Sequence, residues 1–179
     1  MKKGRNSGMT VKRILGNLAL VAAFAALLNA EEAQAQSTVN ATATIQIPQV
    51  LYISVDETAI TFNSPAVDAT DFEAGFKAAD QTSTVTHKGN IVHDVEIKAD
   101  ATDFTATNDP VNNIKPAADF QYSTDGGSNF TSISTTAADV VTAAPQGGNT
   151  QQVNYQILLS YADAADTYTL GFTYTIVAN

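Results

Sequence analysis

Hydrophobic and polar residues alternate along most of this chain, in short segments rich in Val, Ile, Thr, Tyr and Phe. The clearest segments are 91–99, 153–161 and 168–176. Alternation places successive side chains on opposite faces of a β-strand, so each segment predicts a strand with one buried face. No segment after residue 35 shows the apolar spacing of an amphipathic helix.

Shorter apolar or alternating segments separated by Gly, Pro, Asn and Asp fill the remainder. We expect further strands at 39–47, 51–55, 60–62, around 85, and at 104–107, 120–123, 130–133 and 140–142, while 64–81 gives no clear prediction. Gly89 and Asn90 are typical of a two-residue hairpin turn, which would pair Thr86 with His93. About nine or ten short strands predict one all-β domain over 36–179, a two-sheet antiparallel immunoglobulin-like β-sandwich.

The first 35 residues have a different character. Five basic residues precede an apolar run at 14–28, and Ala33-Gln34-Ala35 then supplies a small-x-small cleavage pattern. This layout predicts a signal peptide over 1–35 and a mature chain that begins at Gln36. The run has about 15 residues where a membrane-spanning helix needs about 20, so we expect no membrane insertion after cleavage, although a retained anchor is the alternative. The expected location is secreted, extracellular and at the cell surface, with the periplasm as the alternative compartment.

Removal of that segment makes the chain more acidic, from a net charge of −9 to −12, because four lysines, no arginine and sixteen acidic residues remain. Such a surface repels phosphate backbones and anionic lipids, so we expect no nucleic-acid partner. The chain has no cysteine, which excludes disulfides and thiolate metal sites.

The two histidines are the first candidates for chemistry. If Gly89 and Asn90 form the hairpin turn, His87 and His93 lie on opposite sheet faces and cannot share a metal. His93 falls on the apolar face of its strand, so we expect it to be a buried structural residue. The G-x-S-x-G motif of serine hydrolases is absent, and we predict no enzyme activity.

Acidic residues are the second candidates, as acid/base pairs or calcium ligands, and they cluster at Asp68, Asp71 and Glu73 and at Asp163 and Asp166. An EF-hand loop would need oxygen ligands at fixed spacing about a Gly, and a glycosidase cleft usually carries aromatic residues, whereas this chain has no Trp. We therefore interpret these residues as a solvated surface. Calcium stays open as an alternative, and no other cofactor is predicted.

The segment Ser123-Thr124-Asp125-Gly126-Gly127-Ser128-Asn129-Phe130 resembles the Asp-box hairpin of sialidase-type propellers. Asp125 is expected to accept bonds from turn N–H groups, Gly126 and Gly127 to supply positive φ angles, and Phe130 to return to the core. A sialidase would also need an arginine cluster, and no Arg follows residue 35. We therefore predict a structural turn.

Taken together, residues 38–179 resemble the secreted immunoglobulin-like domains of bacterial surface and coat proteins, of the coat-protein-U type and the WxL type. The resemblance lies in the signal peptide, the Ala-Thr-Ala-Thr-Ile-Gln-Ile strand at 41–47, the segment 50–55 and the closing segment 166–176. It implies a component of the cell surface or of a filament, with no catalytic residues.

The segment 36–47 also suggests how copies would assemble. Its apolar positions alternate cleanly, and Pro48 separates it from the rest of the domain; those positions are Val39, Ala41, Ala43, Ile45 and Ile47. The segment would pair either within its own domain or with a neighbour, and buried area does not choose between these arrangements.

Three classes of function follow. The first is a structural surface protein or filament subunit whose partner is itself or another surface protein through strand pairing. The alternative is a secreted adhesin or a glycan- or protein-binding module, with an exposed aromatic surface sought at Tyr52, Tyr122 and Tyr161. An exported hydrolase has the least support.

Overall fold

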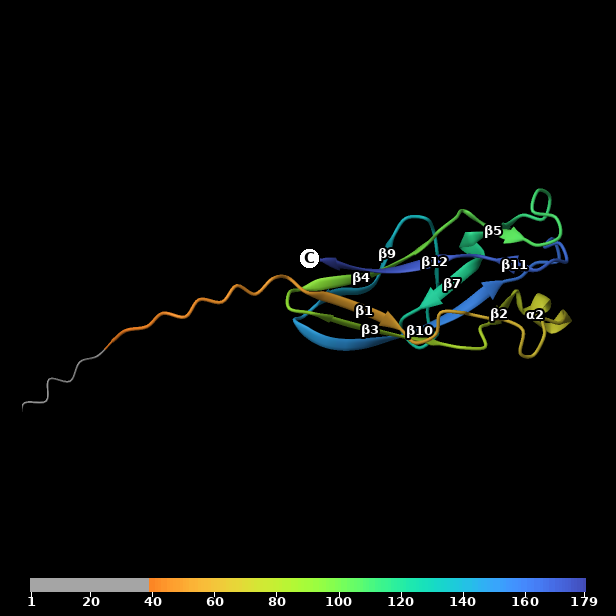
Figure 1. Ribbon diagram of the computed structural model, residues 1–179. Coiled ribbons are helices and arrows are strands. Elements are labelled where there is room, and N and C mark those ends of the chain that lie inside the picture. Colours follow the sequence, from red (N-terminus) through yellow and green to blue (C-terminus); the bar gives the residue numbers. More distant parts are fainter. Residues whose placement is uncertain (1–38) are drawn as a thin grey trace, which may run out of the picture. The chain divides into compact units, whose positions relative to one another are not determined.

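A six-stranded and a three-stranded antiparallel β-sheet share one core, and a smaller three-stranded sheet adjoins them, in a computed structural model, which describes residues 39–179 (Figure 1). Ile47–Asn179 form one compact unit, and residues 39–46 belong to a separate unit. The predicted signal peptide and its cleavage site lie outside the described residues. Among the described helices, none is long and apolar enough to span a bilayer.

The first sheet is built around one long central strand, β10 (Gly147–Leu158). Its first half pairs with β3 (Ser83–Gly89), which in turn pairs with β1 (Leu51–Val55) at the sheet edge. Its second half lies between β2 (Phe76–Ala78) and β7 (Phe120–Ser123), and β8 (Thr131–Ser132) follows β7.

The second sheet places β4 (His93–Ala99) between β12 (Phe172–Ala178) and β9 (Ala138–Ala144). A smaller ladder joins β5 (Asp103–Ala106) to β11 (Tyr168–Thr169) and β6 (Lys115–Pro116). Between the two ladders the backbone N–H of Asp100 donates to Gly171 O over 2.9 Å. A 3₁₀ turn, η1 (Ala117–Asp119), leads into β7. The prediction of an all-β antiparallel fold is confirmed.

The core lies between the two sheets and is formed by the alternating residues that the sequence placed on one face. Val153, Tyr155 and Ile157 of β10 are buried, as are Val95 and Ile97 of β4. Their outward neighbours stay partly or fully exposed, which is the pattern of strands with one buried face.

Aromatic side chains join the two sheets across this core. Phe120 stacks on Tyr155 with 5.4 Å between ring centroids, and Phe172 packs against both rings. The hydroxyls of Tyr155 and Tyr174 lie 2.7 Å apart, and burial raises the pKa of each phenol. The contacts bind β10 to β12 at the centre of the domain.

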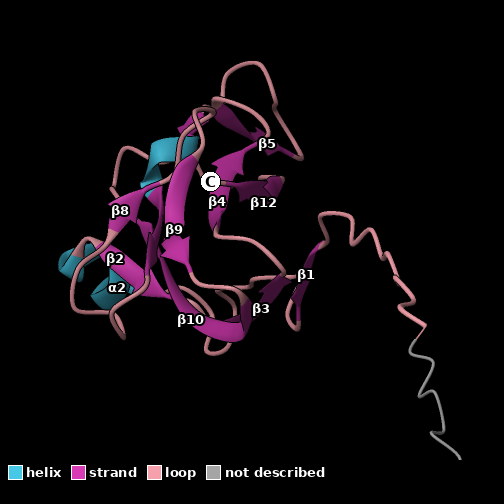
Figure 2. Ribbon diagram, turned by 90° about the vertical axis from the view of Figure 1, so that its left-hand side faces the viewer, coloured by secondary structure: helices cyan, strands magenta, loops and turns pink. Residues whose placement is uncertain are grey.

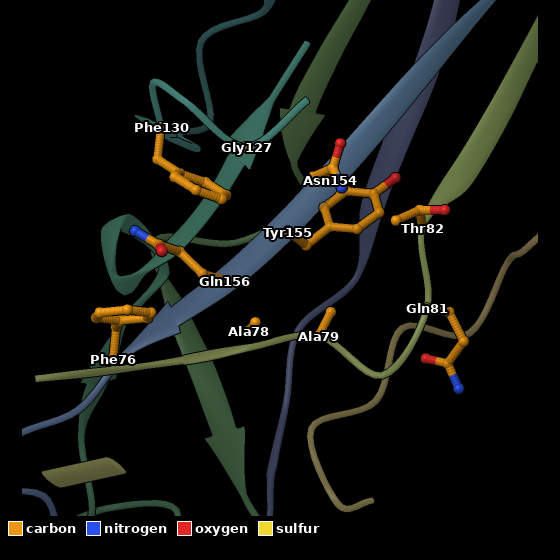
Figure 3. A pocket seen from close by; sticks show the side chains of 10 residues that line it. All are labelled: Phe76, Ala78, Ala79, Gln81, Thr82, Gly127, Phe130, Asn154, Tyr155 and Gln156. Atoms are coloured by element: carbon orange, nitrogen blue, oxygen red, sulfur yellow. The ribbon is translucent and has the colours of Figure 1, made fainter. Parts of the chain in front are cut away.

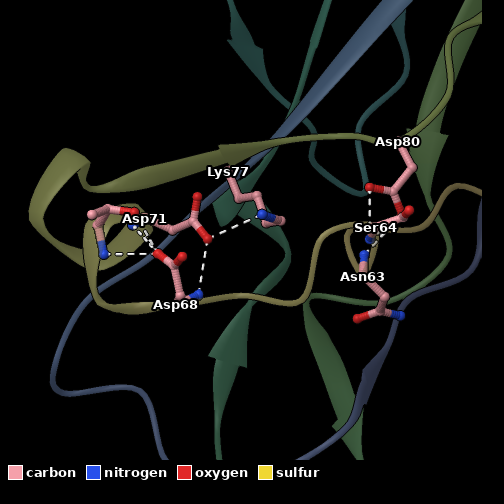
Figure 4. A network of polar contacts seen from close by, with 7 residues as sticks. Asn63, Ser64, Asp68, Asp71, Lys77 and Asp80 are labelled. Atoms are coloured by element: carbon pink, nitrogen blue, oxygen red, sulfur yellow. Dashed lines mark hydrogen bonds and ion pairs between the residues drawn. The ribbon is translucent and has the colours of Figure 1, made fainter.

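Two predicted strands do not form. The segment 39–47 contains no strand, and every residue from 39 to 50 is exposed. The segment 60–62 also forms no strand, and the Thr61 hydroxyl instead donates to Asp80. Asp80 also accepts from the backbone N–H groups of Asn63 and Ser64 (Figure 4). Ile60 and Phe62 nevertheless pack against the core.

A short helix that the sequence did not predict, α2 (Ala69–Ala74), lies within 64–81. Asp68 caps its first turn, because its side chain accepts from Thr70 N and Asp71 N. The Asp71 side chain in turn accepts from Asp68 N (Figure 4). Gly75 ends it at a φ of 78°, in the left-handed region. Because six residues form less than two turns, no apolar stripe marks this helix in the sequence.

Candidate functional site

The two histidines meet inside the core, and the prediction that they lie on opposite faces is wrong. His87 Nδ1 and His93 Nε2 are 2.9 Å apart, and the two residues are 2 % and 0 % exposed. The physical reason is that β3 and β4 belong to different sheets, so the chain crosses from one sheet to the other at 89–92 instead of turning back in a hairpin.

Hydrogen bonds hold this pair in place. His93 Nδ1 lies 3.0 Å from Ile91 O, which only accepts, so Nδ1 carries a proton, and His93 Nε2 shares a hydrogen bond with His87 Nδ1. Burial lowers the pKa of His87, and the nearby His93 lowers it further. The described residues contain no group of three or more His, Asp or Glu that would hold a metal. The pair therefore connects β3 of the first sheet to β4 of the second through a buried side-chain hydrogen bond.

The acidic candidates stabilise loops and do not meet in a shared site. Asp166 accepts from Asn108 N, Asp109 N and the Asn113 amide, and the Asn113 bond is the main cause that holds its pKa below the usual range. Asp163 instead pairs with the buried Lys115 over 2.8 Å.

In the acidic cluster at 68–73, Asp68 and Asp71 also have structural roles. Asp68 and Asp71 cap α2, and Asp71 also pairs with the buried Lys77 over 3.0 Å (Figure 4). The Thr70 hydroxyl is the main cause that lowers the pKa of Asp68. Asp68 and Asp71 thus each have a local structural partner, and no such contact among the described residues brings Glu73 into a site with them.

The Asp-box segment forms the expected turn. Asp125 Oδ1 accepts from the backbone N–H groups of Ser128 and Asn129, and Gly126 and Gly127 have φ angles of 76° and 86°. The Ser123 hydroxyl is the main cause that lowers the pKa of Asp125. Phe130 differs from expectation, because it is only half-buried and lies outside the core cluster.

The three tyrosines proposed for an aromatic surface have different environments. Tyr122 is buried in the core. Tyr52 is half exposed, with Lys88 Nζ 5.8 Å from its ring centroid, and Tyr161 is exposed and stacks on Phe72 at 5.2 Å. Only two of the three therefore reach the surface.

Strands β1 and β12 are the neighbouring edges of the two main sheets. The outer edge of each strand has no partner among residues 39–179, and the two edges lie on the same side of the domain (Figure 2). Their inward residues are only half-buried: Leu51, Ile53 and Val55 in β1, and Phe172, Tyr174 and Ile176 in β12.

An edge position alone does not explain this exposure. Strand β9 is also an edge of its sheet, and its residues Val140 and Ala144 are 7 % and 4 % exposed, whereas Ala138 and Val141 pack against the core half-buried. The inward residues of β1 and β12 are thus more exposed than Val140 and Ala144 of β9, although the two edge strands lie close to each other.

The apolar segment 39–47 forms no strand and is exposed in the described part of the chain. Val39, Ile45 and Ile47 are 88 %, 81 % and 72 % exposed, and Ala41 and Ala43 are exposed as well. Directly after this segment, the Asn90 side chain donates to Pro48 O over 2.7 Å and accepts from Val50 N over 2.8 Å, which holds the residues that lead into β1.

No protein-family model matches this sequence, and no curated protein shows significant similarity to it.

Proposed function

We propose that this protein is a non-enzymatic, extracellular structural protein of the cell surface, a filament subunit that assembles by β-strand addition. The segment 38–47 of one copy would pair with the open side between β1 and β12 of the next. Such a contact is head-to-tail and does not close, so it would generate a fibre. The observation that carries the proposal is the half-buried inward face of these two strands beside an edge without a partner.

The strand order supports an immunoglobulin-like arrangement that lacks its last strand. In that fold one sheet has the order A-B-E-D and the other C-F-G. Here β1-β3-β10-β7 corresponds to A-B-E-D, and β4 and β12 correspond to C and F. The position of strand G is the open edge of β12. A strand supplied by another copy would occupy that position.

The segment has the length and the composition that this position requires. Nine residues at 39–47 extend about 30 Å, and the seven residues of β12 extend about 23 Å, so the segment would cover the whole edge. Burial of Val39, Ile45 and Ile47 would contribute roughly 5 to 8 kcal/mol before the cost of association.

Deletion of 36–47 tests the proposal. We expect the full mature chain to form filaments, visible by electron microscopy and by light scattering after size exclusion, and the truncated chain to stay monomeric. A synthetic peptide of 36–47 should bind the truncated chain and raise its Tm. The control is the same peptide with Ile45→Asp and Ile47→Asp, which should leave the Tm unchanged.

Two results would contradict strand addition. Full-length protein that stays monomeric at high concentration, with no filaments on cells, would exclude donation between copies. Failure of the truncated chain to bind the peptide would show that the side between β1 and β12 is not an acceptor. If full-length protein is monomeric but the truncated chain binds the peptide, the segment pairs within its own domain.

A further inference from the structure

A groove of about 470 Å³ lies beside β10, where the strand that flanks it is interrupted (Figure 3). Strand β2 pairs with β10 up to Ala78, Ala79 N still donates to Tyr155 O over 3.0 Å, and β3 resumes the pairing at Ser83, so residues 80–82 leave the ladder. Asn154 and Gln156 alternate with the buried residues of β10 and therefore lie on its outer face. They line the groove together with Gln81 and Thr82.

Two phenylalanines lie at one end of this groove. Phe76 is 43 % exposed, and Phe130 is half-buried beside Gly127, whose added Cβ would be 3.7 Å from the ring. Figure 3 shows both rings at the same end, with Gln156 between them. Neither residue belongs to the core cluster, so the core does not explain their position. Exposed aromatic rings in a concave site are typical of ligand contacts.

The polar groups of the groove are neutral, and one of them lacks a partner. Gln156 Nε2 donates to Gln121 Oε1 over 2.6 Å, which fixes the orientation of that amide. Asn154 Oδ1 is enclosed, and no described residue donates to it. An enclosed acceptor without a donor is unfavourable, so a hydroxyl or N–H that enters the groove would be favoured once the amide turns toward it.

The lining also restricts the class of ligand. It contains no charged side chain, although the whole chain has a net charge of −9. A neutral ligand fits such a surface better than an ionic one. A peptide strand cannot add to the β10 backbone there, because β2 and β7 already pair with both edges at Gln156 and Ile157.

We infer that this groove binds a neutral saccharide, with the C–H face of a sugar ring on Phe76 and Phe130 and its hydroxyls on the Asn154 and Gln156 amides. Each ring offers a flat apolar surface, and each amide offers both a donor and an acceptor. The site goes beyond subunit assembly and is independent of it. A filament of such subunits would present one groove per subunit.

Titration of the full-length chain by NMR with cellohexaose and maltohexaose tests the inference. We expect saturable shifts of the Phe76 and Phe130 ring protons for at least one of them, with a Kd on the order of 1 mM. Phe130→Leu and Phe76→Leu keep an apolar side chain but lose the flat ring, so each should weaken binding about tenfold. Tyr161→Leu, at an exposed aromatic outside the groove, is the matched control and should bind like the unmodified chain.

Four results would overturn the inference, provided that the Tm of each variant shows it to be folded. One is unchanged affinity in both Phe variants. Another is the absence of saturation by either saccharide up to about 20 mM. A third is tighter binding of the charged hexagalacturonate than of either neutral saccharide. The last is tighter binding of decaproline than of either saccharide, because aromatic grooves also bind polyproline helices.

Discussion

The buried His87–His93 pair predicts that the fold loses stability on mild acidification. Burial holds the pKa of His87 below 6.5 in the folded state, whereas the unfolded chain has the ordinary value. Between these two pKa values the unfolded state binds a proton that the folded state does not. The free energy of unfolding therefore falls as the pH falls below about 6.5, until folded His87 itself becomes protonated.

The size of the effect follows from the number of protons and from the hydrogen bonds. One linked proton gives a limiting slope of about 1.4 kcal/mol per pH unit. Protonation also gives His87 a second N–H donor inside the core, and no carboxylate among the described residues is bonded to either ring to receive it. The pair lies beside the 89–92 crossover, where Asn90 holds the start of β1 and Val92 O accepts from Asn179 N.

Urea denaturation at several pH values between 7.5 and 5 measures this slope. We expect the free energy of unfolding of the unmodified chain to fall below pH 6.5 with a slope of at most about 1.4 kcal/mol per pH unit, and that of the double variant His87→Leu/His93→Leu to be nearly independent of pH. Asp125→Asn is the control and should keep the full slope, because the depressed pKa of Asp125 places its titration below this range. Equal slopes for the unmodified chain and the double variant would refute the reasoning.

Three further predictions concern packing and processing. Gly89→Ala should cost about 1–3 kcal/mol in urea denaturation, because the new Cβ would lie 2.8 Å from both His93 Nδ1 and a Leu51 methyl. Lys115→Ala should cost about 3 kcal/mol in the same assay, since it removes the buried partner of two carboxylates at 3.0 and 2.8 Å; a loss below about 1 kcal/mol would contradict this. Mass spectrometry of exported protein should find Gln36 at its N-terminus, and an uncleaved chain in the membrane fraction would exclude the signal peptide.

The sequence predicted which residues face the core but not which strands pair. Alternation is local, so Val153, Tyr155 and Ile157 could be assigned to one buried face from their spacing alone. Pairing depends on distant segments. Gly89 and Asn90 have the composition of a hairpin turn, yet β3 pairs with β1 and β10 and leaves β4 to the other sheet.

Features that depend on side-chain capping or on distant contacts were also missed. The signal for α2 was present as Asp68, Asp71 and Gly75, a capping pair followed by a left-handed glycine, but without an apolar stripe. The groove near Phe76 and Phe130 had no sequence signal, because it requires β2 and the turn after β7 to meet over β10. In the segment 39–47 the sequence signal is present but the element is not: the alternation predicts a strand, and the described structure has none there.

Charge and strand pairing act together in the proposed assembly. An open edge beside a half-covered core favours indiscriminate association, and a chain without cysteine cannot close that edge with a disulfide. The predicted net charge of −12 opposes general contact between domains, but such repulsion is screened beyond about 8 Å in physiological salt. The segment 39–47 carries no charge, so it would approach the acceptor edge with less repulsion than any acidic face of the domain. The negative charge that keeps domains apart is absent from the segment 39–47, so strand addition would be the preferred contact between copies.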